Sequence, residues 1–198
     1  MYKIFASNKP LIITDQQQLF KENSANVFIH YQVPEDLTIA IDNLENLEEL
    51  NSVVVYHNNL KELWKQIGSN FKIIEAAGGK VFNESEEILF IERFNKWDLP
   101  KGKKESDEMP AETAIREVNE ECGLSNVAII EPLKTTYHTY KLGTERIIKK
   151  TYWFAMNYEG DEVLVPQKEE GIINAKWFPK NNLVEPLSNT YRSIQELF

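Results

Sequence analysis

Short apolar runs alternate with turn residues over the first 70 positions. The β-rich runs predict four strands, at residues 2–5, 11–14, 26–33 and 52–56. A turn is expected at Asn8-Lys9-Pro10, and Pro34-Glu35-Asp36 is expected to end the third strand. Leucines and isoleucines between 37 and 50 have helical spacing, although 38–41 also suits a strand. Residues 59–67 predict a second helix that ends at Gly68-Ser69-Asn70.

Beyond residue 70 the apolar pattern indicates longer strands and one well-marked helix. The predicted strands are residues 71–77 continuing through a glycine pair to 82, then 88–93, 127–132, 134–140, 147–157 and 175–178. Residues 94–105 are expected to form a loop, and helices are expected at about 111–122 and 188–198. Strands interleaved with a few helices favour a layered α/β fold. The chain therefore divides into an N-terminal α/β extension, 1–70, and a second domain, 71–198.

Composition narrows the class of protein. The chain has 198 residues, of which 42% are hydrophobic, enough to form a packed core. No apolar run approaches the roughly 18 residues of a membrane span. The start of the sequence lacks the apolar stretch and cleavage site of a secretory signal. A single cysteine, Cys122, cannot form an internal disulfide, so we expect a soluble protein of the reducing cytoplasm with no membrane partner.

The formal net charge of −9 disfavours a nucleic-acid partner, since a duplex binder needs a basic face. Solubility alone accounts for excess acid of this size. Acidic charge does not exclude an anionic substrate, however. A cluster of carboxylates can hold a divalent cation, and the cation can meet a phosphate.

Candidate chemistry gathers in and before the predicted helix at 111–122. Pro110 suits the first turn of a helix, and Gly123 suits the left-handed position after the last turn. The apolar side that should pack on a sheet consists of Ala111, Ala114, Ile115, Val118 and Cys122. The helix boundaries are therefore well signalled by the sequence.

Three glutamates occupy a neighbouring face of that helix. Glu117, Glu120 and Glu121 stand at i, i+3 and i+4, where like charges repel by some tenths of a kcal/mol per pair. Arg116 lies a residue off that face, and a fourth acid, Glu108, sits in the preceding loop. A hard cation such as Mg²⁺, with Mn²⁺ as a substitute, would relieve the repulsion. The triplet taken alone is better explained as a solvated acidic face.

The full spacing changes that balance. The pattern G-x5-E-x7-R-E-U-x-E-E-x-G-U, with U apolar, is met at every position, by Gly102, Glu108, Arg116, Glu117, Val118, Glu120, Glu121, Gly123 and Leu124. Chance would produce it on the order of once in 10⁹ starting positions. The segment resembles the Nudix box. The similarity extends to the glycine pair Gly78-Gly79, to Arg93 near a strand end and to the Trp97–Pro100 run, so it covers about 71–198 and none of the first 70 residues.

The resemblance implies a fold and roles for the box residues. The fold implied is an α/β/α sandwich with a mixed sheet, in which the box forms a loop–helix–loop. Glu117, Glu120 and Glu121 would bind divalent metal, often with the backbone carbonyl of Lys101. Glu108 and Arg116 would pair and hold the loop to the helix, beside the structural glycines Gly102 and Gly123. Water would attack a phosphorus, with Glu117 or Glu121 taking the proton.

A later acidic pair, Glu169 and Glu170, could supply the base or a further metal ligand, although exposed acids in loops are ordinary. The Pro100-Lys101-Gly102 form resembles dinucleoside polyphosphate hydrolases, diphosphoinositol polyphosphate hydrolases and messenger-RNA decapping enzymes. Candidate substrate-binding residues are Arg93, Lys101, Lys103, His138, Lys149 and Glu170. The charges of the segment 146–150 serve equally well as a solvated strand surface.

The function implied is metal-dependent hydrolysis of a diphosphate linkage in a nucleoside polyphosphate or a related phosphate-rich small molecule. One alternative is an ADP-ribose or nucleotide-sugar pyrophosphatase. The other is a non-catalytic regulator on the same fold, which the complete box and the acidic chain disfavour. The role of residues 1–70 stays open, and pairing of two copies as a homodimer is suggested by analogy alone.

Overall fold

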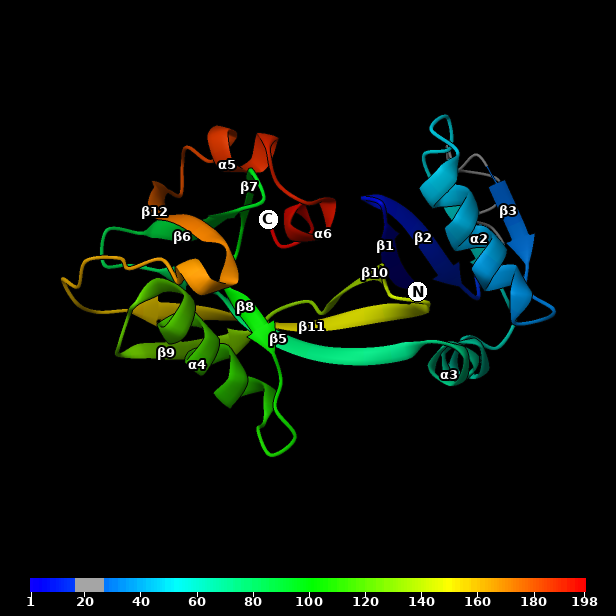
Figure 1. The fold of residues 1–198 in the computed structure, drawn as a ribbon, viewed down its shortest axis with the longest axis horizontal. Helices are drawn as coiled ribbons and strands as arrows, with labels where there is room; N and C mark the ends of the chain where they lie inside the picture. Colours follow the sequence, from blue (N-terminus) through cyan, green and yellow to red (C-terminus); the bar gives the residue numbers. More distant parts are fainter. Residues whose placement is uncertain (17–26) are drawn as a thin grey trace. The chain divides into compact units, whose positions relative to one another are not determined.

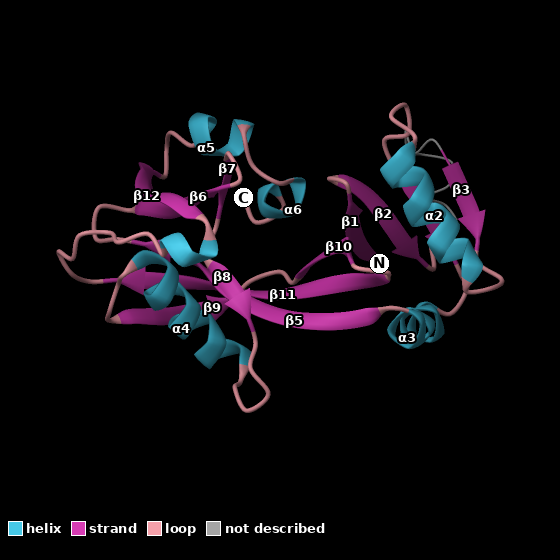
Figure 2. Cartoon of the chain, in the orientation of Figure 1, coloured by secondary structure: helices cyan, strands magenta, loops and turns pink. Residues whose placement is uncertain are grey.

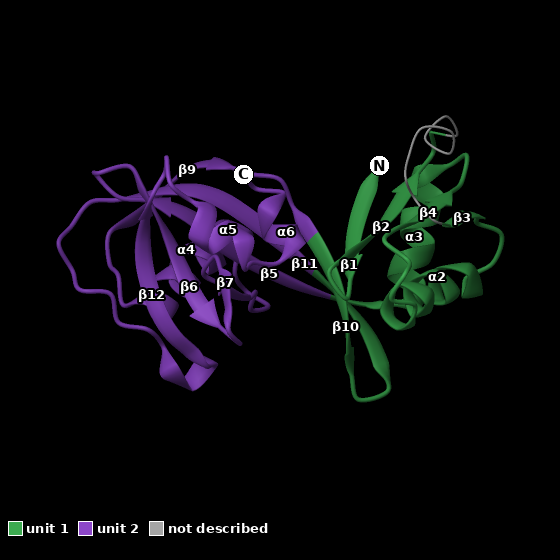
Figure 3. Cartoon of the chain, turned by 90° about the horizontal axis from the view of Figure 1, so that it is seen from above, with its two compact units in different colours: residues 1–73, 137–149 green, residues 74–136, 150–198 purple. Residues whose placement is uncertain are grey.

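The computed structural model describes residues 1–16 and 27–198 and divides into two compact units (Figure 3). Unit 1 comprises residues 1–73 and 137–149, and unit 2 comprises residues 74–136 and 150–198. Two long strands, β5 (Lys72–Phe82) and β11 (Glu145–Tyr158), contribute residues to both units. The predicted domains, 1–70 and 71–198, are two continuous segments, whereas each unit combines two segments of the chain. The division into domains stays a prediction. The segment 137–149 follows residue 70 and yet belongs to unit 1.

Unit 1 is built on a sheet whose strand order is β10-β1-β2-β4-β3, with the start of β11 beside β10. Figure 1 labels these strands except β4. Its strands are β1 (Tyr2–Ala6), β2 (Lys9–Thr14), β3 (Val27–His30), β4 (Val53–Tyr56) and β10 (Thr136–Leu142). Strands β2 and β3 both run parallel to β4, whereas β1 and β2 are antiparallel. The predicted third strand begins at residue 26, which lies outside the described residues.

Two helices, α2 (Glu35–Asn46) and α3 (Leu60–Asn70), drawn in cyan in Figure 2, belong to unit 1. Their buried side chains join those of the strands in the core of this unit. The strand alternative for residues 38–41 is wrong, because the helical stripe Leu37, Ala40, Ile41 and Leu44 is the buried one. Helix α3 ends at Asn70, the last residue of the segment Gly68-Ser69-Asn70 that was predicted to end it, and so runs three residues past Ile67. The Asn70 side-chain amide donates to the Gln66 carbonyl at 2.7 Å. The first turn lies at Ser7 and Asn8, both with positive φ, so Lys9 and Pro10 begin β2.

Unit 2 contains the sheet order β12-β6-β5-β11, with three short strands added to it. Strand β6 (Glu87–Arg93) pairs with both β12 (Ile172–Pro179) and β7 (Lys96–Asp98). Strand β8 (Lys101–Lys103) pairs with β5, and β9 (Val127–Pro132) pairs with β11. The loop expected at 94–105 is therefore wrong, because Phe94 and Asn95 both adopt positive φ and turn the chain back into strands.

The C-terminal segment differs from the single helix expected at 188–198. It forms α5 (Val184–Ser188) and α6 (Arg192–Gln195), separated by a β-bridge between Thr190 and Trp97. The Thr190 hydroxyl donates to the Trp97 carbonyl at 2.6 Å, and Trp97 N–H donates to the Asn189 carbonyl at 2.9 Å. Because Asn189 and Thr190 bond to β7, the predicted helix is interrupted at these two residues.

Helices cover two sides of the unit 2 strands. One apolar cluster joins α4 (Pro110–Cys122) to β5, β6, β9 and β11, and a second joins α6 to β6, β7, β11 and β12. This helix–sheet–helix layering confirms the predicted α/β/α sandwich. Among residues 1–16 and 27–198, no helix is long and apolar enough to cross a membrane.

Candidate active site

Helix α4 is held at both ends by the residues that marked its limits in the sequence. Pro110 occupies the first turn, and Gly123 follows the last turn in the left-handed conformation, with φ 68°. The Glu112 carboxylate accepts the Met109 N–H at 2.8 Å, which satisfies a backbone donor at the N-terminus. The helix packs its buried side, including Ala114, Val118 and Cys122, on the sheet. Its register therefore fixes where the glutamates point.

The three glutamates of the triplet lie in three different environments. Glu120 is exposed, with 48% of its side chain accessible, whereas the Glu117 side chain is 12% accessible. Glu121 is buried at 1%. Burial raises the pKa of Glu121 to about 7, although the nearby Lys101 charge opposes that rise. Burial also raises the pKa of Glu117. The exposure of the three carboxylates on this face thus decreases from Glu120 through Glu117 to Glu121.

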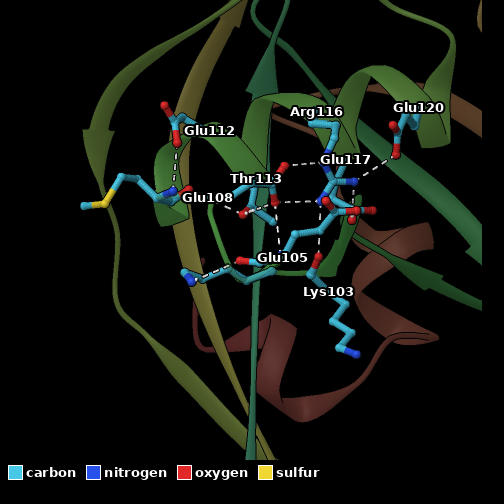
Figure 4. A network of polar contacts seen from close by, with 10 residues as sticks. Lys103, Glu105, Glu108, Glu112, Thr113, Arg116, Glu117 and Glu120 are labelled. Atoms are coloured by element: carbon cyan, nitrogen blue, oxygen red, sulfur yellow. Dashed lines mark hydrogen bonds and ion pairs between the residues drawn. The ribbon is translucent and has the colours of Figure 1, made fainter.

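Arg116 connects the loop to the glutamates (Figure 4). Its Nε and Nη2 donate to the two oxygens of Glu108 at 2.5 and 2.9 Å, and Nη1 donates to Glu117 at 2.8 Å and Glu120 at 2.9 Å. Nη2 also reaches the Lys103 carbonyl at 3.2 Å. The interpretation that Arg116 lies off the carboxylate face is wrong for its guanidinium, because the long side chain spans from the loop to Glu120.

The Glu108 carboxylate is the strongest partner of this guanidinium. Hydrogen bonds from Arg116 and then from the Thr113 hydroxyl lower the pKa of Glu108 from 4.5 to about 2. A carboxyl whose pKa falls on folding stabilises the folded state above its ordinary pKa, and the contribution disappears as pH falls through the folded value. The Glu108 contribution is therefore complete above pH 4.5 and lost towards pH 2.

Glu108→Gln should therefore lower the melting temperature at pH 7 and flatten its dependence on pH below 4.5. Circular dichroism melts from pH 7 to pH 2 measure both effects. Glu84→Gln, in an exposed turn, serves as the control and should keep the wild-type profile. Parallel melting curves for Glu108→Gln and the wild type across this range would contradict the assignment.

Gly102 and Glu117 are in close contact. A Cβ added at Gly102 would lie 1.8 Å from Glu117 Oε2, so the carboxylate occupies the space that any other residue's side chain would need. Glycine at this box position is explained by close approach of a carboxylate to the backbone.

Lys101 holds the buried glutamate through its backbone. Its N–H donates to Glu121 Oε2 at 2.8 Å. Its ammonium lies 2.7 Å from Asp98 Oδ2, with 11% of the Lys101 side chain and 7% of the Asp98 side chain exposed. The predicted role of Lys101 as a substrate contact stays a prediction, and in this structure its ammonium pairs with Asp98. Asp98 was missed by sequence reasoning, since a lone acid between Trp97 and Leu99 gives no motif.

Arg93 and Glu170 come together from β6 and from η1 (Lys168–Glu170), with 3.4 Å between Nη1 and Oε2. The Arg93 Nε is buried and has no hydrogen-bond partner among the described residues. The charge of Glu170 contributes to the raised pKa of Glu117, so this acid of the later loop lies within electrostatic range of the helix triplet. Arg93 and Glu170 therefore bring a guanidinium and a fourth carboxylate to the edge of the box.

Other candidate contacts are not brought to this cluster. Lys103 offers its carbonyl to Arg116 while its side chain is exposed, and its contact with substrate stays a prediction. His138 and Lys149 belong to unit 1, and their predicted roles also stay open. Arg146, near the start of β11, pairs with Glu45 at 2.5 Å and with Asp42 at 2.6 Å. These ion pairs link β11 to α2.

The carboxylates suit a hard divalent cation in their chemistry. Carboxylate and carbonyl oxygens are the ligands that Mg²⁺ prefers, and two of the three glutamates are removed from water. Within the described part of the chain, no three acidic, histidine or cysteine side chains already converge as a metal-ligand set. The reason is local: Arg116 holds Glu117 and Glu120, while Lys101 N–H holds Glu121. The residues fit the ion, provided that these side chains reorient on binding.

Comparison with known proteins identifies the family of the greater part of this chain. The model of the NUDIX domain matches residues 72–198. Curated relatives named RNA pyrophosphohydrolase, from Brucella anthropi and Brucella ovis, are 35% and 33% identical over 75 residues, which is 33% of this chain and 42% of each relative. The chain thus matches less than half of the length of these relatives.

Two solved structures match part of this chain at low sequence identity. A C. elegans Ap4A hydrolase binary complex has a TM-score of 0.46 and 18% identity, over 61% of this chain and 90% of that one. A MutT protein from Methanosarcina mazei Go1 has a TM-score of 0.47 and 23% identity, over 64% and 91%.

Proposed function

The chain belongs to the Nudix domain family, and from that premise we propose that it hydrolyses a diphosphate linkage in a nucleoside polyphosphate or a related phosphate-rich substrate. The observation that carries the proposal is the graded carboxylate face of α4, with Glu121 buried, Glu117 partly buried and Glu120 exposed. A face of this kind offers oxygen ligands and a proton acceptor in one place.

Glu117, Glu120 and Glu121, with the carbonyl of Lys101, would hold Mg²⁺ or Mn²⁺. When bound, the cation supplies positive charge for phosphate oxygens and lowers the pKa of water. Glu121, whose pKa burial raises in the metal-free site, is one candidate for the base. Glu117, whose pKa is also raised by burial, is the other candidate base.

The residues around the triplet have supporting roles in this proposal. Arg116 holds the loop carboxylate Glu108 and steadies Glu117. Arg93 offers a guanidinium beside the box, a group suited to phosphate oxygens. In this proposal, Glu170, which pairs with Arg93, would release that partner to an anionic substrate. Lys103 is a further cation proposed to contact the phosphate chain.

The substrate class rests on weaker support than the reaction. The relatives named RNA pyrophosphohydrolase support cleavage of a phosphoanhydride, and they match less than half of their own length. The Pro100-Lys101-Gly102 form supports a polyphosphate substrate. ADP-ribose and nucleotide sugars stay as the alternative. A reducing cytoplasm is proposed as the location, which fits Cys122 as a buried free thiol, and the homodimer is a further proposal.

A diphosphate panel tests the function. The purified chain is incubated with Mg²⁺ or Mn²⁺ and a dinucleoside polyphosphate, nucleoside triphosphates, ADP-ribose, a nucleotide sugar, a diphosphoinositol polyphosphate and a 5′-triphosphate RNA oligonucleotide. Released phosphate and nucleoside monophosphate are measured, with a chelator as the control. We expect metal-dependent turnover of at least one polyphosphate. A folded protein that cleaves no member of the panel would reject the proposal, and cleavage of ADP-ribose alone would select the alternative.

A further inference from the structure

A buried ion pair lies immediately before the box in the sequence. Asp98, the last residue of β7, and Lys101, the first of β8, approach to 2.7 Å and are almost wholly withdrawn from solvent. Burial of two charges costs desolvation free energy, and an apolar pair of similar size is often as stable or more so. Stability alone is therefore a weak reason for this pair, and its neighbours suggest another.

Lys101 acts on the Glu121 carboxylate in two ways. Its backbone N–H donates to Glu121 Oε2 at 2.8 Å. Its ammonium also lies within electrostatic range, since each of the two charges shifts the pKa of the other group. A lysine ammonium free to move would find in Glu121 a buried carboxylate with which to pair. The ammonium pairs with Asp98 instead.

Asp98 is itself rigidly placed, which makes it a dependable partner. Its second oxygen, Oδ1, accepts the Leu99 N–H at 2.8 Å. Its backbone pairs with Ile91 of β6, and the preceding residue, Trp97, is tied to Thr190 by the hydrogen bond of 2.6 Å described above. The carboxylate that holds the Lys101 ammonium is therefore fixed from both sides of the short strand.

We propose that Asp98 is a positioning residue that retains the Lys101 ammonium and so prevents it from neutralising Glu121. The Glu121 carboxylate then keeps one oxygen on the Lys101 N–H and the other for a divalent cation. Asp98 touches neither substrate nor metal in this scheme; it acts through Lys101, and its own charge also adds to the raised pKa of Glu121. The inference rests on the proposed metal-binding role of Glu121.

Direct binding of Mn²⁺ tests the proposal without any substrate. Free Mn²⁺ is measured by electron paramagnetic resonance in titrations of the wild type, Asp98→Asn and the double variant Asp98→Asn with Lys101→Met. In Asp98→Asn the released ammonium should pair with Glu121, and the affinity for Mn²⁺ should fall roughly 10–100-fold, as when support of a metal ligand is lost. The double variant lacks the competing ammonium and should recover most of that affinity.

Two controls separate positioning from general loss of stability. Ile88→Val shortens a core side chain in the second apolar cluster of unit 2, and should lower the melting temperature while leaving Mn²⁺ affinity unchanged. Glu196→Gln removes one partner of the exposed pair with Lys134 and should alter neither quantity. Melting temperatures of all variants are recorded without metal, so that folding is known before titration.

Weaker Mn²⁺ binding by Asp98→Asn together with recovery in the double variant supports the proposal. Wild-type affinity in Asp98→Asn, or a double variant no better than Asp98→Asn, overturns it. If Asp98→Asn fails to fold while the double variant folds and binds Mn²⁺, the pair serves only the fold, and the proposal is also overturned. Failure of the wild type to bind Mn²⁺ would instead reject the proposed function.

Discussion

Glu121→Gln should abolish metal-dependent turnover, with a loss on the order of 10²–10⁴-fold, the range typical of a lost general base. Glutamine has nearly the shape of glutamate and can still accept the Lys101 N–H through its amide oxygen. It cannot take a proton or present a charged oxygen to a cation. The buried carboxyl already has a pKa of about 7, so the neutral side chain should be well tolerated by the fold.

The measurement for Glu121→Gln is kcat for the best substrate of the panel, together with a melting curve. Glu112→Gln is the matched control: the same substitution on the same helix, at the exposed cap, where the amide can still accept the Met109 N–H. That control should keep activity near the wild-type level. Activity retained by Glu121→Gln in a folded protein would remove Glu121 from the proposed mechanism.

Gly78→Ala should strongly destabilise unit 2, because the added methyl group would overlap backbone atoms. An added Cβ would lie 2.2 Å from the Pro100 carbonyl oxygen and 2.3 Å from the Lys101 Cβ. Both neighbours belong to the segment that leads into β8, which pairs with β5 at Gly78 itself. Because backbone rather than a flexible side chain must move, we expect roughly 1–3 kcal/mol of lost stability or more. Displacement of Lys101 should also lower activity through Glu121.

The melting temperature of Gly78→Ala should fall by several degrees, at about 2–4 °C per kcal/mol for a chain of this size. Three of the four tryptophans, Trp97, Trp153 and Trp177, lie in unit 2 and Trp64 lies in unit 1, so tryptophan fluorescence reports mainly on unit 2. Gly68→Ala is the control, because the nearest atom to its added Cβ is 3.8 Å away and alanine favours the helix. An unchanged melting temperature for Gly78→Ala would show that β5 and β8 are less tightly packed than described.

The sequence alone determined the features that depend on near neighbours. Pro110 and Gly123 marked helix α4, since capping residues act within one turn of the chain. The spacing of Gly102, Glu108 and the glutamate triplet indicated the family, because the box is a continuous segment. Alternating apolar positions also predicted most strands of unit 2 and its layering, although short strands β7 and β8 escaped because their turn depends on Phe94 and Asn95 adopting positive φ.

Only the tertiary structure decided most of the partners of the charged groups. The resemblance implied the pair of Arg116 with Glu108, which the structure contains, but not the contact of Arg116 with Glu120. Neither did the sequence specify that Lys101 pairs with Asp98 or that Arg146 pairs with Glu45. The tertiary structure also assigned residues 137–149 to unit 1, through pairing of β10 with β1. Such contacts join positions that the chain brings together only after strands pair and helices pack, because a charge carries no periodicity that identifies its distant partner.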